Sequence, residues 1–127
     1  MEKKILLIDD EEDFCYFFKE NLEAISNYEV IVATKGKNGI RAALEEKPDL
    51  ILLDIMMPGI DGFEVLKRLK SNEKTLNIPV IMLTAKNEDE SKIKAAGLYC
   101  DDYIVKPVEK IVLKAKIHKI LSITTLL

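Results

Sequence analysis

The sequence contains few of the residues and segments that mark several large classes of protein. It has no tryptophan, one histidine and only two cysteines, Cys15 and Cys100, in 127 residues. These cysteines lie far apart without metal-binding spacing, so we expect reduced thiols and a cytoplasmic location. No apolar run approaches the roughly 20 residues that span a bilayer. The apolar start of the chain ends at the acidic residues 9–13, which favours a buried strand over a secretory signal.

The charge of the chain argues against nucleic-acid binding. The formal net charge is -3, and Arg41 and Arg68 are the only arginines among nineteen basic residues. Nucleic-acid surfaces are normally basic, and arginine supplies the forked contacts to phosphates. Apolar residues make up 48% and charged residues 32%, a composition typical of one globular domain. We therefore expect a single domain that contacts neither nucleic acid nor membrane directly.

Short apolar runs alternate with stretches of helical periodicity along the whole chain. The runs predict strands at 5–8, 29–33, 50–53, 80–83 and 103–105. Each strand is followed by a predicted helix, the fourth opening at Asn87 and the last after Pro107. The apolar stripe of the first helix is expected to consist of Phe14, Phe17, Phe18, Leu22 and Ile25. Five strands and five helices in alternation predict an α/β fold with a doubly wound parallel sheet, for which the strand order 2-1-3-4-5 is favoured.

Polar side chains follow four of these strands. Asp9 and Asp10 come after the first strand, Asp54 after the third, and Thr84 and Lys106 after the fourth and fifth. Because the carboxyl ends of parallel strands share one edge of the sheet, these groups should meet there. Three carboxylates repel one another unless a hard cation lies among them. A hydroxyl and an ammonium group beside that cation suit an anion, so the sequence predicts a metal-dependent phosphoryl site.

The segments around these residues resemble the receiver domain of two-component response regulators, of the chemotaxis and transcription-factor types. The matching motifs, in order, are Ile8–Glu11, Leu53–Gly62, Leu83–Ala85 and Asp101–Pro107. The resemblance covers about residues 3–121 and implies a flavodoxin-like sheet of order 2-1-3-4-5, an order known from chemotaxis receivers themselves. It places a receiver domain at residues 1–121, with residues 122–127 as a C-terminal tail or the start of a linker.

The resemblance also implies which residues carry the chemistry. Asp54 would be the phosphoacceptor, since a carboxylate can attack phosphorus and form an acyl phosphate. Asp9 and Asp10 would bind Mg²⁺ or Mn²⁺ together with Asp54 and the backbone carbonyl of Met56. Lys106 would pair with the acids and then with a phosphoryl oxygen, and its bond to the following proline is cis in the family.

The function implied is that of a signalling switch rather than an enzyme with a separate substrate. The phosphoryl group would come from the phosphohistidine of a sensor histidine kinase or a histidine phosphotransfer protein. Thr84 would donate its hydroxyl to that group, and Tyr103 would move inward with it. The fourth helix, the fifth strand and the last helix would then present an altered face to an output protein or effector domain. The domain would catalyse its own phosphotransfer and a slow autodephosphorylation.

Two alternatives stay open at this point. The chain can be a receiver cut from a multidomain DNA-binding transcriptional regulator or a hybrid kinase rather than a complete protein. A different class is a metal-dependent, aspartate-based phosphatase of the haloacid type, which also uses aspartates at strand ends. Such enzymes need an Asp-x-Asp pair after the first strand, where this chain has Asp9-Asp10-Glu11.

Several conspicuous residues are predicted to lie outside the chemistry. The pair Asp101 and Asp102 precedes its strand, so it should serve turns and caps at the opposite edge of the sheet. His118 is expected to be a partly exposed helical residue rather than a phosphodonor. Tyr99-Cys100 and Val108 replace the Gly-Ala and Phe that are common in the family, near the output face.

Overall fold

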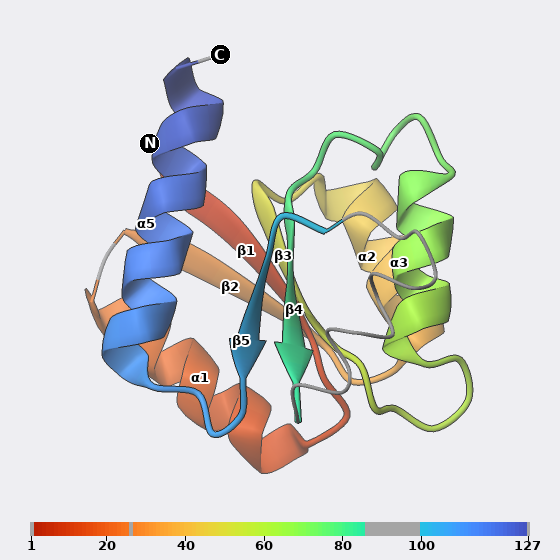
Figure 1. Cartoon of the computed structure of the whole chain (residues 1–127), viewed down its shortest axis with the longest axis horizontal. Coiled ribbons are helices and arrows are strands. Elements are labelled where there is room, and N and C mark those ends of the chain that lie inside the picture. Colours follow the sequence, from red (N-terminus) through yellow and green to blue (C-terminus); the bar gives the residue numbers. More distant parts are fainter. Residues whose placement is uncertain (1, 26, 86–99, 127) are drawn as a thin grey trace.

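The computed structural model of the chain describes residues 2–25, 27–85 and 100–126. In chain order the strands and helices are β1 (Lys3–Ile8), α1 (Glu12–Ile25), β2 (Tyr28–Ala33), α2 (Gly36–Glu46), β3 (Leu50–Asp54), α3 (Gly62–Lys70), β4 (Val80–Thr84), β5 (Asp102–Val105) and α5 (Lys110–Leu126). Strands and helices alternate along these residues as far as β4, and β5 is the next described element (Figure 1). The helix expected to open at Asn87 falls on residues 86–99, which lie outside the described residues.

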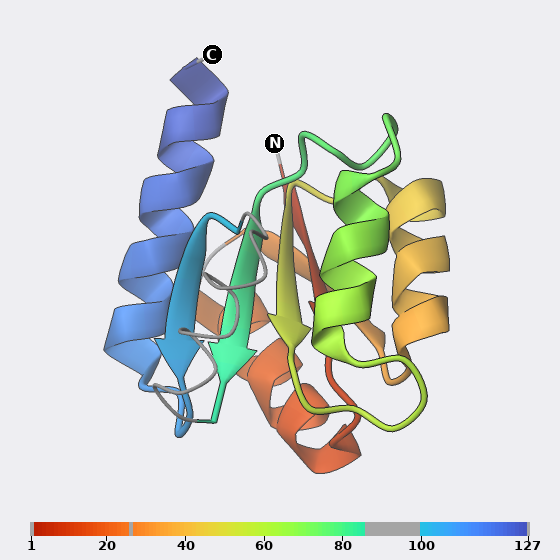
Figure 2. The same cartoon turned by 45° about the vertical axis from the view of Figure 1, so that its right-hand side comes forward.

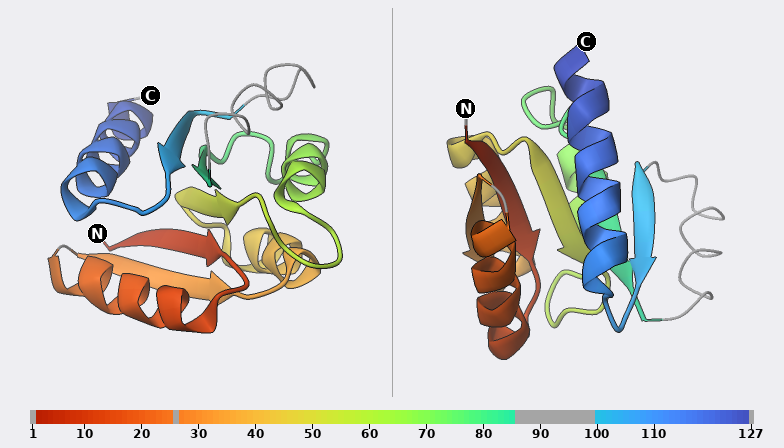
Figure 3. Two further views of the ribbon diagram at one scale, coloured as in Figure 1. Left: turned by 60° about the horizontal axis from the view of Figure 1, so that its bottom comes forward. Right: turned by 90° about the vertical axis from the view of Figure 1, so that its left-hand side faces the viewer.

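The five strands form one parallel sheet of order β2-β1-β3-β4-β5, which confirms the predicted topology. Helices α1 and α5 cover one face, and α2 and α3 cover the other (Figures 1 and 2). The two further views in Figure 3 show the same layers from the end of the sheet and from its side. In the register, Ile8 pairs with Leu53 and Thr84 with Val105, so the residues that follow these strands emerge at the same edge.

The sheet is apolar on both faces because every inner strand lies between two layers of helices. Successive residues of β1 point to opposite faces of the sheet. Ile5 and Leu7 pack with α1 and α5, whereas Leu6 and Ile8 pack with α2 and α3. All five residues of β3 and all five of β4 are buried. Within the described residues, no helix combines the length and the apolar character that a membrane crossing requires.

The predicted inner stripe of α1 was wrong at Phe17. Phe17 is 68% exposed, while Cys15, Phe18 and Leu22 are buried in the core. A step of three or four residues from Phe14 reaches either Phe17 or Phe18, and these differ by about 100° around the helix. The buried stripe is centred between Phe18 and Leu22, so Cys15 lies inside it and Phe17 lies outside. Cysteine behaves as a small apolar residue in such a position.

Helix α5 runs without interruption to Leu126, past the position where a tail was expected to begin. Leu113, Ile117 and Leu121 anchor it to the sheet. The assignment of residues 122–127 to a tail or linker stays a prediction.

Candidate functional site

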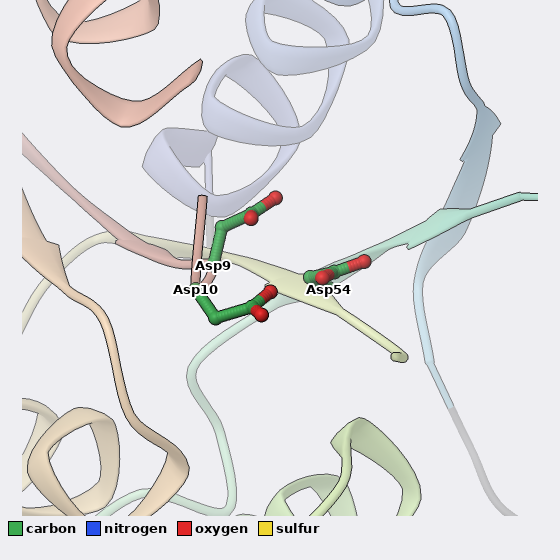
Figure 4. Close-up of side chains that lie close together, drawn as sticks. All are labelled: Asp9, Asp10 and Asp54. Atoms are coloured by element: carbon green, nitrogen blue, oxygen red, sulfur yellow. The ribbon is translucent and has the colours of Figure 1, made fainter. Parts of the chain in front are cut away.

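The carboxyl ends of β1 and β3 bring three aspartates together. Asp9 and Asp10 follow β1, and Asp54 is the last residue of the neighbouring strand β3. One carboxylate oxygen from each lies within 4.8 Å of the others (Figure 4). Ligands on opposite sides of a magnesium ion are separated by about 4.2 Å, so small side-chain movements would close this cluster around such an ion. The meeting of these three residues was predicted from the strand pattern, and the structure shows it.

Burial makes this cluster electrostatically strained in the absence of a cation. Asp9 is fully buried and Asp54 is only 5% exposed, while Asp10 is partly buried. Burial and then the charge of Asp9 raise the pKa of the Asp54 carboxyl to about 6, although Lys106 opposes the rise. A positive ion in the cluster would relieve both effects.

Lys106 provides the positive charge that the described residues place beside the acids. Its ammonium Nζ donates a hydrogen bond to Asp9 Oδ2 at 3.0 Å and lies 3.4 Å from Asp54 Oδ1 and 3.6 Å from Glu11 Oε1. Burial alone would lower the pKa of Lys106, but the hydrogen bond to Asp9 and the neighbouring carboxylates raise it. The peptide bond between Lys106 and Pro107 is cis, as the resemblance implied.

Thr84 ends β4 beside these groups and has an unused hydroxyl. The residue is fully buried, and its Oγ1 is the only buried side-chain oxygen or nitrogen without a hydrogen-bond partner among the described residues. An orphaned buried hydroxyl is costly, so its retention suggests a partner that arrives from outside the chain. Tyr103, in the adjacent strand, is partly buried against the core on the α2 and α3 side. Its movement with Thr84 stays a prediction.

The loop between β3 and α3 is held close to the acid cluster by Gly62. The Gly62 amide donates to the carbonyl of Ile55 at 2.8 Å, and a Cβ at this position would lie 2.3 Å from the Asp54 carbonyl oxygen. Only glycine permits this close approach of two backbone segments. Within the loop, Met56 is 67% exposed and Met57 is buried. The Met56 thioether therefore points to solvent, and the proposed role of its carbonyl stays a prediction.

Asp9 is fixed by contacts that the sequence did not indicate. Its Oδ1 accepts from the Glu11 amide at 3.0 Å, and its carbonyl accepts from Cys15 Sγ at 3.2 Å. Burial and the charge of Asp9 raise the pKa of the Cys15 thiol to about 12, so it remains a protonated donor. The contact between Glu11 and Lys106 was not predicted either. The position of Glu11, two residues after the predicted metal ligand Asp9, is the sequence feature that could have indicated this contact.

The second acid pair lies at the opposite edge of the sheet and serves structure, as predicted. Asp101 Oδ2 accepts from the Val80 amide at 2.7 Å and so joins the starts of β4 and β5. Asp102 pairs with Lys116 of α5 at 2.8 Å. His118 is exposed on α5. Of the residues that depart from the family pattern, Cys100 and Val108 are partly buried, and Tyr99 lies outside the described residues.

The comparison with protein families tests the phosphatase alternative. The family model of the response regulator receiver domain matches residues 5–118. The chain belongs to this family. The aspartate-based phosphatase alternative is not supported. The roles predicted for the acid cluster, Lys106 and Thr84 stay predictions.

Similar proteins include a transcriptional regulator and a receiver domain. The chain is 44% identical over 121 residues to the alkaline phosphatase synthesis transcriptional regulatory protein PhoP of Bacillus subtilis. The aligned residues make up 95% of this chain and 49% of PhoP. The receiver domain of Francisella response regulator 1452 has a TM-score of 0.85 at 31% identity, over 96% of this chain and 98% of that one. The chain thus spans about half the length of the curated relatives it matches.

A more distant structure shows the fold alone. The receiver domain of sensor histidine kinase PA1611 from Pseudomonas aeruginosa PAO1 is 23% identical with a TM-score of 0.86, over 96% of this chain and 99% of that one. In that crystal structure a magnesium ion is coordinated in the active-site cleft.

Proposed function

We propose that this chain is a phosphorylation-controlled switch that accepts a phosphoryl group on Asp54 from the phosphohistidine of a histidine kinase or phosphotransfer protein. The observation that carries the proposal is the combination of a buried acid cluster with an ammonium group and an orphaned hydroxyl. Asp54 has both Lys106 at 3.4 Å and two further carboxylates within 4.8 Å. Such a set binds and orients a transferring phosphoryl group better than it serves stability.

The donor set fits a hard divalent cation. Asp9, Asp10 and Asp54 offer only oxygen, which Mg²⁺ prefers, and Mn²⁺ accepts the same ligands. The backbone carbonyl of Met56 would complete the protein ligands. The magnesium ion in the cleft of the PA1611 receiver supports this assignment. When bound, the cation would neutralise negative charge on the phosphoryl oxygens.

The transfer moves one phosphoryl group between two nucleophiles. A carboxylate oxygen of Asp54 attacks phosphorus, and the bond from phosphorus to the imidazole nitrogen breaks with its electron pair staying on the imidazole. Lys106 holds one phosphoryl oxygen by its ammonium, and the Thr84 hydroxyl donates to another. Both donors would stabilise the negative charge that develops on the phosphoryl oxygens. Slow attack by water on the acyl phosphate would return the domain to its starting state.

The signal would then pass to an output surface. Engagement of the Thr84 hydroxyl by the phosphoryl group would shift β4 toward the site and leave space for Tyr103 to turn inward. The face of β5 and α5, together with the predicted fourth helix, would bind an effector domain or an output protein. PhoP is a transcriptional regulatory protein about twice as long as this chain, so we propose an output of that kind in the cytoplasm.

Acetyl phosphate tests this proposal because it replaces the kinase. The chain with Mg²⁺ and acetyl phosphate should gain one phosphoryl group by intact mass, and chelation of the metal should prevent the gain. Asp54→Asn should abolish labelling. Asp61→Asn is the matched control, since Asp61 is exposed and caps α3, a task that asparagine also performs. Undiminished labelling of Asp54→Asn would exclude the assignment.

A further inference from the structure

An aromatic ring from α1 lies against the ammonium group of the site. The Nζ of Lys106 is 4.9 Å from the centroid of the Phe14 ring. Phe14 belongs to the first part of α1, and Lys106 to the turn between β5 and α5, which passes beside α1 in Figures 1 and 2. A cation within about 6 Å of a ring centroid is attracted by the negative face of the ring.

The carboxylates alone leave the position of this ammonium loosely defined. A lysine side chain is flexible, and its charge has no preferred direction of hydrogen bonding. Asp9, Asp54 and Glu11 lie between 3.0 and 3.6 Å from Nζ, so several positions offer similar attraction. The side chain of Lys106 is 20% exposed, which leaves solvent as a further competitor.

The ring of Phe14 is partly buried and is held by contacts with the core. Phe14 packs on Phe18 with centroids 5.5 Å apart and planes tilted by 45°. Phe18 is itself 5% exposed, and Phe14 packs against the same core. Because the ring has less freedom to move than the lysine side chain, their contact restricts the ammonium group.

We propose that Phe14 is a positioning residue for phosphoryl transfer, and that the face of its ring holds the Lys106 ammonium at Asp54. The inference rests on the proposed function. When a phosphoryl group arrives, Lys106 has to contact a phosphoryl oxygen while Asp9 and Asp54 turn to a cation. The ring then remains as a partner that neither event removes. Ordinary packing at the edge of the core would need only an apolar side chain of similar volume at this position.

Fluorination of the ring separates these two roles. Phe14 is replaced in turn by mono-, di- and trifluorophenylalanine, which weaken the negative ring face with little change in size. We expect the rate of labelling by acetyl phosphate and Mg²⁺ to fall stepwise, by roughly threefold to tenfold over the series. The same series at Phe17, which is 68% exposed on the same helix, should leave the rate unchanged. Equal rates across the Phe14 series, with unfolding free energies unchanged, would overturn the inference.

A spectroscopic measurement tests the contact without catalysis. The ring should shift the ε-methylene protons of Lys106 upfield in NMR spectra, and Phe14→Leu should remove that shift while Phe14→Tyr keeps it. Phe14→Tyr should also keep the labelling rate of the unmodified chain, whereas Phe14→Leu should label more slowly. An upfield shift retained in Phe14→Leu would contradict the inference. Absence of labelling in the unmodified chain would instead overturn the proposed function, and the inference with it.

Discussion

Removing the charge of Asp54 should stabilise the metal-free protein at neutral pH. Burial and the charge of Asp9 raise the pKa of Asp54 from its ordinary 3.8 to about 6. The folded state therefore binds this proton more tightly than the unfolded state, and ionised Asp54 opposes folding. The rise corresponds to roughly 3 kcal/mol at pH 7.5. This figure already includes the opposing attraction of Lys106. Because Asp54→Asn buries a polar amide in place of the carboxylate, we expect a net gain of roughly 1–3 kcal/mol in unfolding free energy.

The sign of the pH dependence follows from the same shift. Stability falls with rising pH wherever the folded state holds more protons, here between about pH 4 and pH 6. The advantage of Asp54→Asn should therefore be absent at pH 4, grow across that window and stay constant above it.

Urea denaturation in the presence of a chelator measures this difference. Circular dichroism is the suitable signal because the chain has no tryptophan. The unmodified chain, Asp54→Asn and the exposed control Asp61→Asn would be compared at several pH values from 4 to 7.5. The reasoning is refuted if Asp54→Asn is the less stable protein at pH 7.5, or if its advantage does not shrink on acidification.

Three further outcomes follow from the same structure. Mg²⁺ at ten times its dissociation constant from the unmodified chain should add roughly 1.4 kcal/mol of stability in thermal melts. An equal gain in Asp10→Asn at the same Mg²⁺ concentration would contradict the shared site. Gly62→Ala should cost roughly 2–3 kcal/mol in urea, because its Cβ would lie 2.3 Å from a backbone oxygen at the end of β3. Gly59→Ala should cost only roughly 1 kcal/mol, since its φ of 80° is strained but the space is open; equal losses at the two glycines would count against the steric argument. A double-mutant cycle of Asp102→Asn and Lys116→Met should give a coupling of roughly 1 kcal/mol that weakens with salt, and zero coupling at low salt would show that the pair contributes nothing.

The acid cluster could be predicted from sequence because its position depends on backbone topology. Asp9 and Asp54 each follow a continuous apolar run, and such runs form inner strands whose ends share one edge. The pairing of Ile8 with Leu53 then brings the acids together whatever the details of side-chain packing. The same reasoning placed Lys106 and assigned Asp101 to the opposite edge.

The contacts around the ammonium group could not be predicted, because they depend on how α1 is rotated against the sheet. Periodicity predicted Phe17 in the inner stripe and did not include Cys15, whereas the packing of α1 buries Cys15 and exposes Phe17. That rotation also sets the ring of Phe14 beside Lys106 and brings Glu11 within 3.6 Å of it. Side chains so far apart in sequence meet through the tertiary fold, which local patterns do not encode.

The most direct test of the central claim is to locate the acyl phosphate on the chain. After incubation with acetyl phosphate and Mg²⁺, borohydride reduction converts a phosphorylated aspartate into homoserine, which peptide mass spectrometry identifies by position. The account predicts homoserine at position 54 alone, and none when the metal is chelated. Homoserine at Asp9 or Asp10, or modification of Asp54 that persists without a divalent cation, would contradict it.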